Sequence, residues 1–230
     1  MPDGGVGNRI AAAFGPHAEL AAFLFAVLDQ HDPPATGSDG SHDLSHILRV
    51  WHSAAAIARS EPACDVELLV AAAILHDCVA VEKNSPLRSQ ASRLAAERAR
   101  GIIGDLGWSA SRIAALVHAI EAHSFSSGVE PDTLEAQILQ DADRLDAIGA
   151  IGIARCFYVA GRMGSALYDP EDFDAGRRPV DDRRYAIDHF KAKLFPVVDG
   201  FRTRAGRAIA AERAAVMRRF IDQFRSEVEA

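Results

Sequence analysis

The sequence predicts an all-α protein, and three observations support this fold class. Apolar residues recur every three or four positions along most of the chain, which is the period of an amphipathic helix. Alanine is abundant and aromatic residues make up only 7% of the chain, a composition that favours closely packed helices over sheet. No segment shows the alternation of apolar and polar residues that is typical of a strand.

The expected helices follow one another from residue 16 onward. Pro16 stands in the first turn of one helix, and Ser85 and Ser109 are suitable N-terminal caps for two others. We expect residues 1–15, which are small and Gly-rich, to form a flexible arm, and residues 31–41, 124–132 and 165–180 to be irregular. The predicted helices cover residues 16–30, 43–60, 66–76, 85–101, 109–123, 133–148, 149–164, 181–195 and 198–227.

The length of 230 residues is enough for one large domain with a substantial core. We expect residues 16–195 to form this domain, as a helical bundle, and residues 196–230 to add an extended C-terminal helical region. That region carries an apolar stripe. It should therefore pack either on the domain or on a second copy of the chain, as a homodimer.

The net charge limits the expected binding partners, and the cysteine content limits the expected compartment. The net charge of −7 and the pI near 5.7 argue against a nucleic-acid polymer but not against a small anionic substrate. Cys64, Cys78 and Cys156 are widely spaced and form no CxxC pair, which suits a reducing cytosol. No secretory signal is visible, and the longest apolar runs look too short to span a bilayer. We therefore expect a cytoplasmic protein without a membrane partner.

An apolar helix ends in the neighbouring pair His76-Asp77. An ionised carboxylate beside so much alanine and leucine is costly unless it is paired or holds a cation. Imidazole and carboxylate are both good ligands for divalent first-row metals. By itself the pair could also be a half-exposed helix cap, so the interpretation as a metal site depends on further ligands.

Two other places supply candidate ligands. His46 lies on a helix face beside Val50, and three carboxylates, those of Asp141, Asp143 and Asp146, fall within six residues of an apolar helix. Like charges this close repel one another unless a positive group lies among them. Two imidazoles and two carboxylates would leave coordination positions open for water and substrate on an octahedral ion such as Mn²⁺ or Mg²⁺.

These residues resemble the HD-domain phosphohydrolases, whose pattern is a helical His, an adjacent His-Asp and a distant Asp on one metal. The order and spacing of His46, His76-Asp77 and the Asp141–Asp146 stretch match that pattern. The likeness extends to the YedJ-like branch of bacterial HD proteins and covers about residues 41–195. It is carried by the segments HDLSHILRVWHSA, AAAILHDCVAVEKN, SRLAAE, HAIEAHSFS, QDADRLDAIGAIGIAR and DDRRYAIDHFKAKL.

The resemblance implies an HD-domain helical bundle that binds one divalent metal ion. Mn²⁺ or Mg²⁺ is favoured, with Fe, Co, Ni or Zn as alternatives. The implied ligands are His46, His76, Asp77 and Asp143. Asp143 is chosen because the ligand in related HD enzymes directly precedes a basic residue, here Arg144. Asp141 remains the alternative.

The resemblance also implies hydrolysis of a phosphate ester or anhydride. The metal would polarise a phosphoryl oxygen and activate water, and nearby cations would stabilise the developing charge. Proton transfer is assigned to Asp77, to Glu82 or to metal-bound water assisted by Asp141, with Lys83 close to the reacting groups. The expected substrate contacts are Lys83, Arg88, His123, Arg144, Tyr185, His189 and Lys193.

Two of these expectations depend on helix geometry. Tyr185, His189 and Lys193 are spaced at i, i+4 and i+8, which would place them on one helical stripe. His118 and His123 are five residues apart, about 140° around a helix, and so are not expected to share an ion. We therefore predict one metal per chain, with His123 facing the site and His118 structural.

The predicted substrate is a small phosphorylated molecule, and a nucleotide is favoured. Pyrophosphohydrolase, nucleotidase and cyclic-nucleotide phosphodiesterase activities all remain open at this stage. The alternative is a metal-stabilised regulatory module that binds a nucleotide without turnover. Open coordination positions argue for the enzyme, because a sensor has no need of them.

Overall fold

The computed structural model describes residues 4–31, 44–79, 81, 85, 87–124 and 127–229. Within those ranges the regular elements are helices, with one isolated bridge between Ala166 and Tyr185 and no named strand. The prediction of an all-α protein is therefore confirmed.

The chain divides into two compact units, Met1–Asp143 and Arg144–Ala230. The division falls inside a helix and not near residue 195, where the sequence placed it. The reason is that helices on the C-terminal side of residue 143 pack against one another and form a core of their own. The two units are described separately below.

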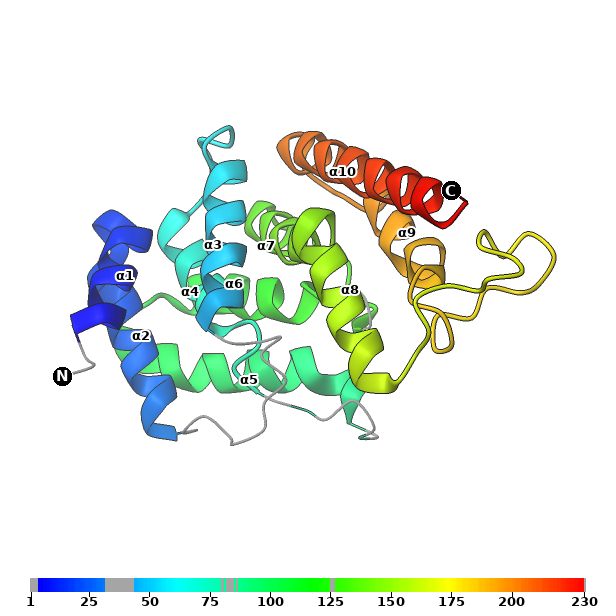
Figure 1. Ribbon diagram of the computed structural model, residues 1–230. Helices are drawn as coiled ribbons and strands as arrows, with labels where there is room; N and C mark the ends of the chain where they lie inside the picture. Colours follow the sequence, from blue (N-terminus) through cyan, green and yellow to red (C-terminus); the bar gives the residue numbers. More distant parts are fainter. Residues whose placement is uncertain are drawn as a thin grey trace. The chain divides into compact units, whose positions relative to one another are not determined.

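The first unit begins with the helical pair α1 and α2 and continues through α3 to α7 (Figure 1). Its elements are α1 (Gly4–Phe14), η1 (Gly15–His17), α2 (Ala18–His31), α3 (Leu44–Ala58), α4 (Val66–Leu75), η2 (Arg88–Gln90), α5 (Ala91–Ile103), η3 (Gly104–Leu106), α6 (Ala110–Ala122) and α7 (Leu134–Asp146), whose last three residues belong to the second unit.

Helix α4 is the centre of this unit. It packs against α2, α3, α5 and α6, and every residue of Leu68–Leu75 is buried. The side chains of Ala71–Ala73 have no exposed area, so their small size lets neighbouring helices approach closely. The carboxylate of Asp65 caps the first turn. The helix therefore presents His76 and Asp77 from a closely packed support.

The N-terminal segment is not the flexible arm that the sequence predicted. Residues Gly4–Phe14 form α1, and Phe14 is only 2% exposed. Its ring stacks on Trp51 with the centroids 5.1 Å apart, and the indole N–H of Trp51 donates to the carbonyl of Ala13 at 2.7 Å. Burial of these aromatic rings outweighs the glycines that suggested flexibility.

One stretch, Gly7–Asp29, has the length and the mean hydropathy, 1.6, of a helix that could cross a membrane. This differs from the expectation that all apolar runs are too short. However, the chain turns at Gly15, whose φ is +50°, a left-handed conformation that glycine adopts readily. The turn separates α1 from α2, which pack on each other. Each is shorter than the roughly 20 residues of a typical spanning helix.

The second unit contains α8 (Gly149–Met163), η5 (Phe190–Leu194), α9 (Phe195–Val198) and α10 (Arg204–Val228). Helix α10 packs on α8, and the ring of Phe157 contacts those of Phe190, Phe220 and Phe224. The side chain of Thr203 caps α10 by accepting from a backbone N–H at 2.9 Å. The predicted C-terminal helix therefore belongs to this core.

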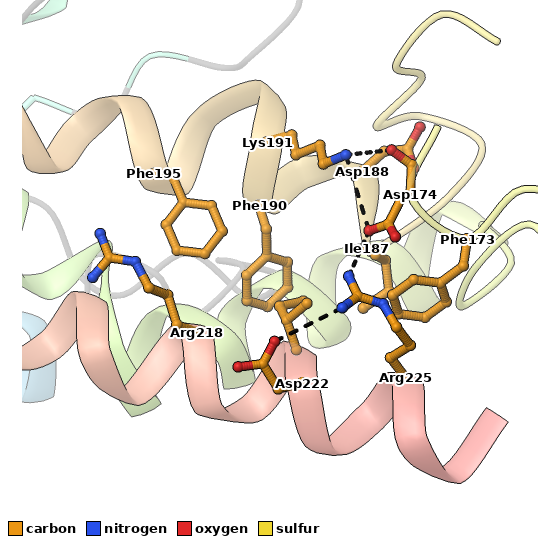
Figure 2. A pocket seen from close by; sticks show the side chains of 11 residues that line it. Phe173, Asp174, Ile187, Asp188, Phe190, Lys191, Phe195, Arg218, Asp222 and Arg225 are labelled. Carbon is orange, nitrogen blue, oxygen red and sulfur yellow. Dashed lines mark hydrogen bonds and ion pairs between the residues drawn. The ribbon is translucent and has the colours of Figure 1, made fainter. Parts of the chain in front are cut away.

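A cavity of about 250 Å³ lies beside the aromatic cluster (Figure 2). The rings of Phe190 and Phe195 belong to its apolar lining. Arg225 of α10 pairs with Asp174 at 2.6 Å and lies 3.8 Å from Asp222. The pair with Asp174 connects α10 to the loop that carries this acid, whereas Asp222 lies one turn away on α10 itself.

Residues 181–195 do not form the continuous helix that the sequence predicted. The backbone N–H groups of Ala186 and Ile187 donate to the carbonyls of Ala166 and Leu167, at 2.9 and 3.0 Å, and so are not used within a helix. Regular helix starts only at Asp188, and η5 is a π-helix. The distant carbonyl partners of this segment explain the difference.

Candidate metal centre

Four of the predicted ligands converge within the first unit. His46 comes from α3, His76 and Asp77 from the end of α4, and Asp143 from α7. The two imidazoles are buried, with 2% and 0% of the side chain exposed, whereas the two carboxylates are 28% and 30% exposed. The site therefore has a buried nitrogen side and a more open oxygen side.

The donor atoms face one another at close range. His46 Nε2 and His76 Nε2 are 3.2 Å apart, and Asp77 Oδ2 lies 3.4 Å from His76 Nε2 and 3.7 Å from His46 Nε2. Asp143 Oδ1 lies 3.6 and 3.9 Å from the nitrogens of His46 and His76. Neighbouring ligands of an octahedral ion at about 2.1 Å are about 3 Å apart. A modest contraction of this set would therefore enclose a divalent cation.

The tautomer of His76 suits a metal ligand. Its Nδ1–H donates to the carbonyl of Ala73 at 2.9 Å, so the lone pair of the neutral ring is on Nε2, toward His46 and the carboxylates. A backbone partner of this kind orients the imidazole of many metal sites. Lone pairs and carboxylate oxygens that face one another need a cation or a proton between them. The donor set therefore fits a metal.

Helix geometry decides whether Asp143 or Asp141 is the fourth ligand. Residues i and i+2 of an α-helix point about 200° apart, so Asp141 and Asp143 cannot both face one point. Asp143 Oδ1 is the atom near both imidazoles, and Asp141 is completely buried. This geometry favours Asp143 as the ligand.

His123 lies beside the same cluster at the end of α6. Its ring packs edge-on against His76 with the centroids 5.0 Å apart, and its Nδ1–H donates to the carbonyl of Ile120 at 2.6 Å. Its Nε2 is 3.7 Å from Asp77 Oδ1. His118, in contrast, accepts from the backbone N–H of Asp132 at 3.2 Å. The two histidines therefore have separate surroundings.

The metal-free site has an unusual protonation state. Burial lowers the pKa of His76, but the negative charges of Asp77 and Asp143, together with the hydrogen bonds of the ring, outweigh burial and raise this pKa from 6.5 to about 9. Because the folded chain holds the proton on His76 more tightly than the unfolded chain does, this proton stabilises the metal-free fold. The stabilisation is fully present below pH 6.5 and is lost as the pH rises through about 9.

We expect metal binding near pH 7.5 to release about one proton, because His76 must deprotonate before Nε2 can bind a cation. The apparent metal affinity should rise roughly tenfold per pH unit until about pH 9. Titration calorimetry of the metal-free protein with Mn²⁺ in two buffers of different ionisation enthalpy measures the released protons. Identical heats in the two buffers would contradict this prediction.

The remaining predicted residues either lie outside the described residues or belong to the second unit. Glu82 and Lys83 lie outside the described residues, as does the side chain of Arg88. The guanidinium of Arg144 donates to the carbonyl of Gly200 within the second unit.

The predicted stripe of Tyr185, His189 and Lys193 is wrong as a helical stripe, because Tyr185 precedes the helix. The ring of Tyr185 is buried and lies 4.3 Å from the guanidinium of Arg178. Lys193 is in the π-helix η5 and is exposed.

Sequence reasoning missed the partner of His189. The Nδ1 atom of His189 lies 2.9 Å from Asp182 Oδ2. The pair of acids Asp181-Asp182 was visible in the sequence, but the seven-residue spacing to His189 does not identify a contact in an irregular segment.

The comparisons with known proteins identify the family of this chain. The model of the family described as HD domain matches residues 43–148, a range that includes all four converging side chains. The uncharacterised protein YpgQ of Bacillus subtilis (strain 168) is 33% identical over 197 residues, which are 84% of this chain and 87% of that protein.

Solved structures are also similar to this chain over most of its length. An HD-superfamily hydrolase from Bacillus thuringiensis is 28% identical with a TM-score of 0.69, over 94% of this chain and 97% of that one. B. subtilis YpgQ in complex with ADP is also 28% identical when the structures are aligned, with a TM-score of 0.64, over 93% of this chain and 97% of that one.

Proposed function

Because this chain belongs to the HD domain family and is a metal-dependent phosphohydrolase, we propose that it hydrolyses a phosphate ester or anhydride of a nucleotide. The observation that carries the proposal is the convergence of two imidazole nitrogens and two carboxylates at 3.2 to 3.9 Å. We assign His46, His76, Asp77 and Asp143 as ligands of one divalent ion. Mn²⁺ or Mg²⁺ is favoured because both take octahedral geometry and bind carboxylates, water and phosphate oxygens, whereas the two imidazoles also suit Fe, Ni or Zn.

When bound, the ion supplies Lewis-acid chemistry, which polarises a phosphoryl oxygen and makes water a nucleophile near neutral pH. The residues of the chain bind the ion and transfer the proton. Two neutral imidazoles and two carboxylates would leave coordination positions for substrate, and Asp77 and Asp143 are the more exposed members of the set.

The carboxylate of Asp77 has two roles in this proposal. Its Oδ2 faces the imidazoles of His46 and His76, whereas Oδ1 faces His123 Nε2 at 3.7 Å. One oxygen would therefore bind the ion, while the other faces His123 and would need a closer approach or one bridging water to pass a proton. The roles of Glu82 and Lys83 stay predictions.

A nucleotide is the proposed substrate because YpgQ, a relative over most of the chain, has been solved with ADP. The acidic net charge of −7 supports a small substrate over a nucleic-acid polymer. The same complex is compatible with a regulatory module that binds nucleotides without turnover, which is the alternative.

The test is a panel of nucleoside triphosphates, monophosphates and cyclic nucleotides with Mn²⁺ or Mg²⁺, in which phosphate and pyrophosphate are measured separately. Pyrophosphate release identifies a pyrophosphohydrolase, phosphate release from monophosphates a nucleotidase, and opening of a cyclic nucleotide a phosphodiesterase. The His76→Ala protein, purified in parallel, controls for contaminating phosphatases. Tight binding without any product would overturn the enzymatic proposal in favour of the regulatory one.

A further inference from the structure

The cavity of the second unit has both an apolar and a charged lining (Figure 2). Every residue that lines it belongs to the second unit, whereas the converging metal ligands belong to the first. Its apolar wall consists of Phe173, Ile187, Phe190, Phe195 and Ile221. Water would suit the charged side chains but not this apolar wall. A ligand with an apolar body and one polar end would suit both.

The apolar wall is suited to an aromatic ring. Phe190 is 1% exposed, and its ring stacks on that of Phe220 with the centroids 5.9 Å apart. The ring of Phe195 is tilted by 54° from that of Phe190, at a centroid distance of 6.2 Å. Aromatic rings prefer edge-to-face and offset arrangements of this kind. A cavity of about 150 Å³ binds benzene, so the volume of about 250 Å³ has room for one ring with a short side chain.

The charged lining favours an anionic ligand. Asp188 binds the guanidinium of Arg178 at 2.5 Å, so its charge is compensated by a residue outside the lining. The other charged residues of the lining are the cations Lys191, Arg218 and Arg225 and the acids Asp174 and Asp222. Three positive and two negative charges leave a net charge of +1. The lining therefore complements a ligand with a single negative charge.

Most of these charges compensate one another at one end of the cavity. Arg225 bonds to Asp174 at 2.6 Å and lies 3.8 Å from Asp222. Lys191 donates to the backbone carbonyl of Asp174, and its ammonium group lies 4.0 Å from the carboxylate of that residue. A ligand anion at this end would meet two carboxylates, whose charges would repel it.

Arg218 supplies the remaining positive charge at the other end. Figure 2 shows its guanidinium beside Phe195 and well apart from Asp174. The guanidinium carbon lies 5.9 Å from the centroid of the Phe195 ring, and no carboxylate pairs with Arg218 in the part of the chain that the structure describes. The side chain is exposed, so a ligand can reach it from solvent. An anion-binding group therefore lies next to the aromatic wall.

We propose that this cavity binds a small aromatic carboxylate, whose ring packs against Phe190 and Phe195 and whose carboxylate binds Arg218. A guanidinium can donate two parallel hydrogen bonds to a carboxylate, which makes the contact specific as well as strong. A nucleotide does not match the cavity, because it carries several negative charges and is larger than one ring with a short side chain. This inference therefore goes beyond the proposed function and does not rest on it.

The test uses phenylacetate with the full-length protein in Mg²⁺ buffer, observed through isoleucine methyl signals in ¹H–¹³C NMR spectra. We expect phenylacetate to shift the signals of Ile187 and Ile221, which line the cavity. The expected Kd is about 1 mM, a value typical of a ligand with about ten non-hydrogen atoms. The signal of Ile138, which is buried in the first unit, should not move.

Two further probes separate the contributions of charge and ring. Phenylacetamide has the shape of phenylacetate without its charge, and it should bind about 5- to 10-fold more weakly because it lacks the ion pair. Acetate has the charge without the ring and should shift neither cavity signal at the same concentrations.

Two variants test the residues. Arg218→Gln should weaken phenylacetate binding about 5- to 10-fold and leave phenylacetamide binding unchanged. Arg219→Gln is the matched control, because it removes the same charge from an exposed neighbour on α10 that does not line the cavity. Ile221→Phe fills the cavity and should abolish the response of Ile187 to both aromatic ligands, with the melting temperature as a control for folding.

Three results would overturn the proposal. The first is a wild-type protein whose Ile187 and Ile221 signals do not respond to phenylacetate at about 10 mM, well above the expected Kd. The second is equal binding of phenylacetate and phenylacetamide by the wild type. The third is an equal loss of phenylacetate binding in Arg218→Gln and Arg219→Gln, which would show that the general charge of α10, and not Arg218, attracts the anion.

Discussion

Replacement of His76 with alanine is expected to remove the bound metal and to lower kcat/KM about 10³-fold or more, since loss of a metal's charge stabilisation is worth several kcal/mol. His76 is the most buried of the four converging side chains, with no exposed area. Its Nε2 lies within 3.2 to 3.9 Å of His46, Asp77 and Asp143.

The measurement is the metal content of protein purified without chelator, together with kcat/KM on the best nucleotide. Wild-type protein should contain about one divalent ion per chain and the variant almost none. His118→Ala is the matched control, because it removes an imidazole of α6 that bonds to Asp132 and not to the cluster. A His76→Ala protein that keeps one ion per chain would refute the ligand assignment.

Removal of the metal by a chelator is expected to lower the melting temperature by roughly 8–16 °C. A ligand present at about 1,000 times its Kd stabilises the native state by about 4 kcal/mol, and each kcal/mol corresponds to about 2–4 °C for a chain of this size. The physical reason is that the ion binds the folded donor set and not the unfolded chain. Its loss leaves Asp77 and Asp143 near each other with only protonated imidazole to compensate their charge.

Calorimetry or fluorescence melting with and without EDTA measures this effect, and added Mn²⁺ should restore the original melting temperature. Hydrogen exchange should show lost protection at the end of α4 and unchanged protection along α10, which belongs to the other unit. The His76→Ala protein should not respond to EDTA. If the wild type also failed to respond, the ion would have no stabilising role.

Local sequence patterns predicted most helices correctly because their causes are local. The segment Val66–Leu75, with Asp65 as its cap, is a helix in the structure, and Ser109 caps α6 as expected. Periodicity and capping act over three or four residues, so they can be read without knowledge of the fold.

The errors have causes that lie far away in the chain. Phe14 orders the N-terminal segment only because Trp51 is present to stack on it. The predicted helix is interrupted before Asp188 because the carbonyls of Ala166 and Leu167 accept the N–H groups of Ala186 and Ile187. A helical spacing such as that of Tyr185, His189 and Lys193 has no meaning where the backbone takes its hydrogen bonds from elsewhere.

The sequence by itself determined the helical class, the kinds of donor atom available and, through its likeness to HD proteins, the family and the metal-dependent chemistry. Only the tertiary structure decided which donors meet: His46 and His76 lie 3.2 Å apart although 30 residues separate them, and Asp143 approaches them from a third helix. It also revealed the contact between Asp182 and His189. The physical reason is that helix formation depends on neighbours along the chain, whereas convergence of side chains depends on how buried helices pack.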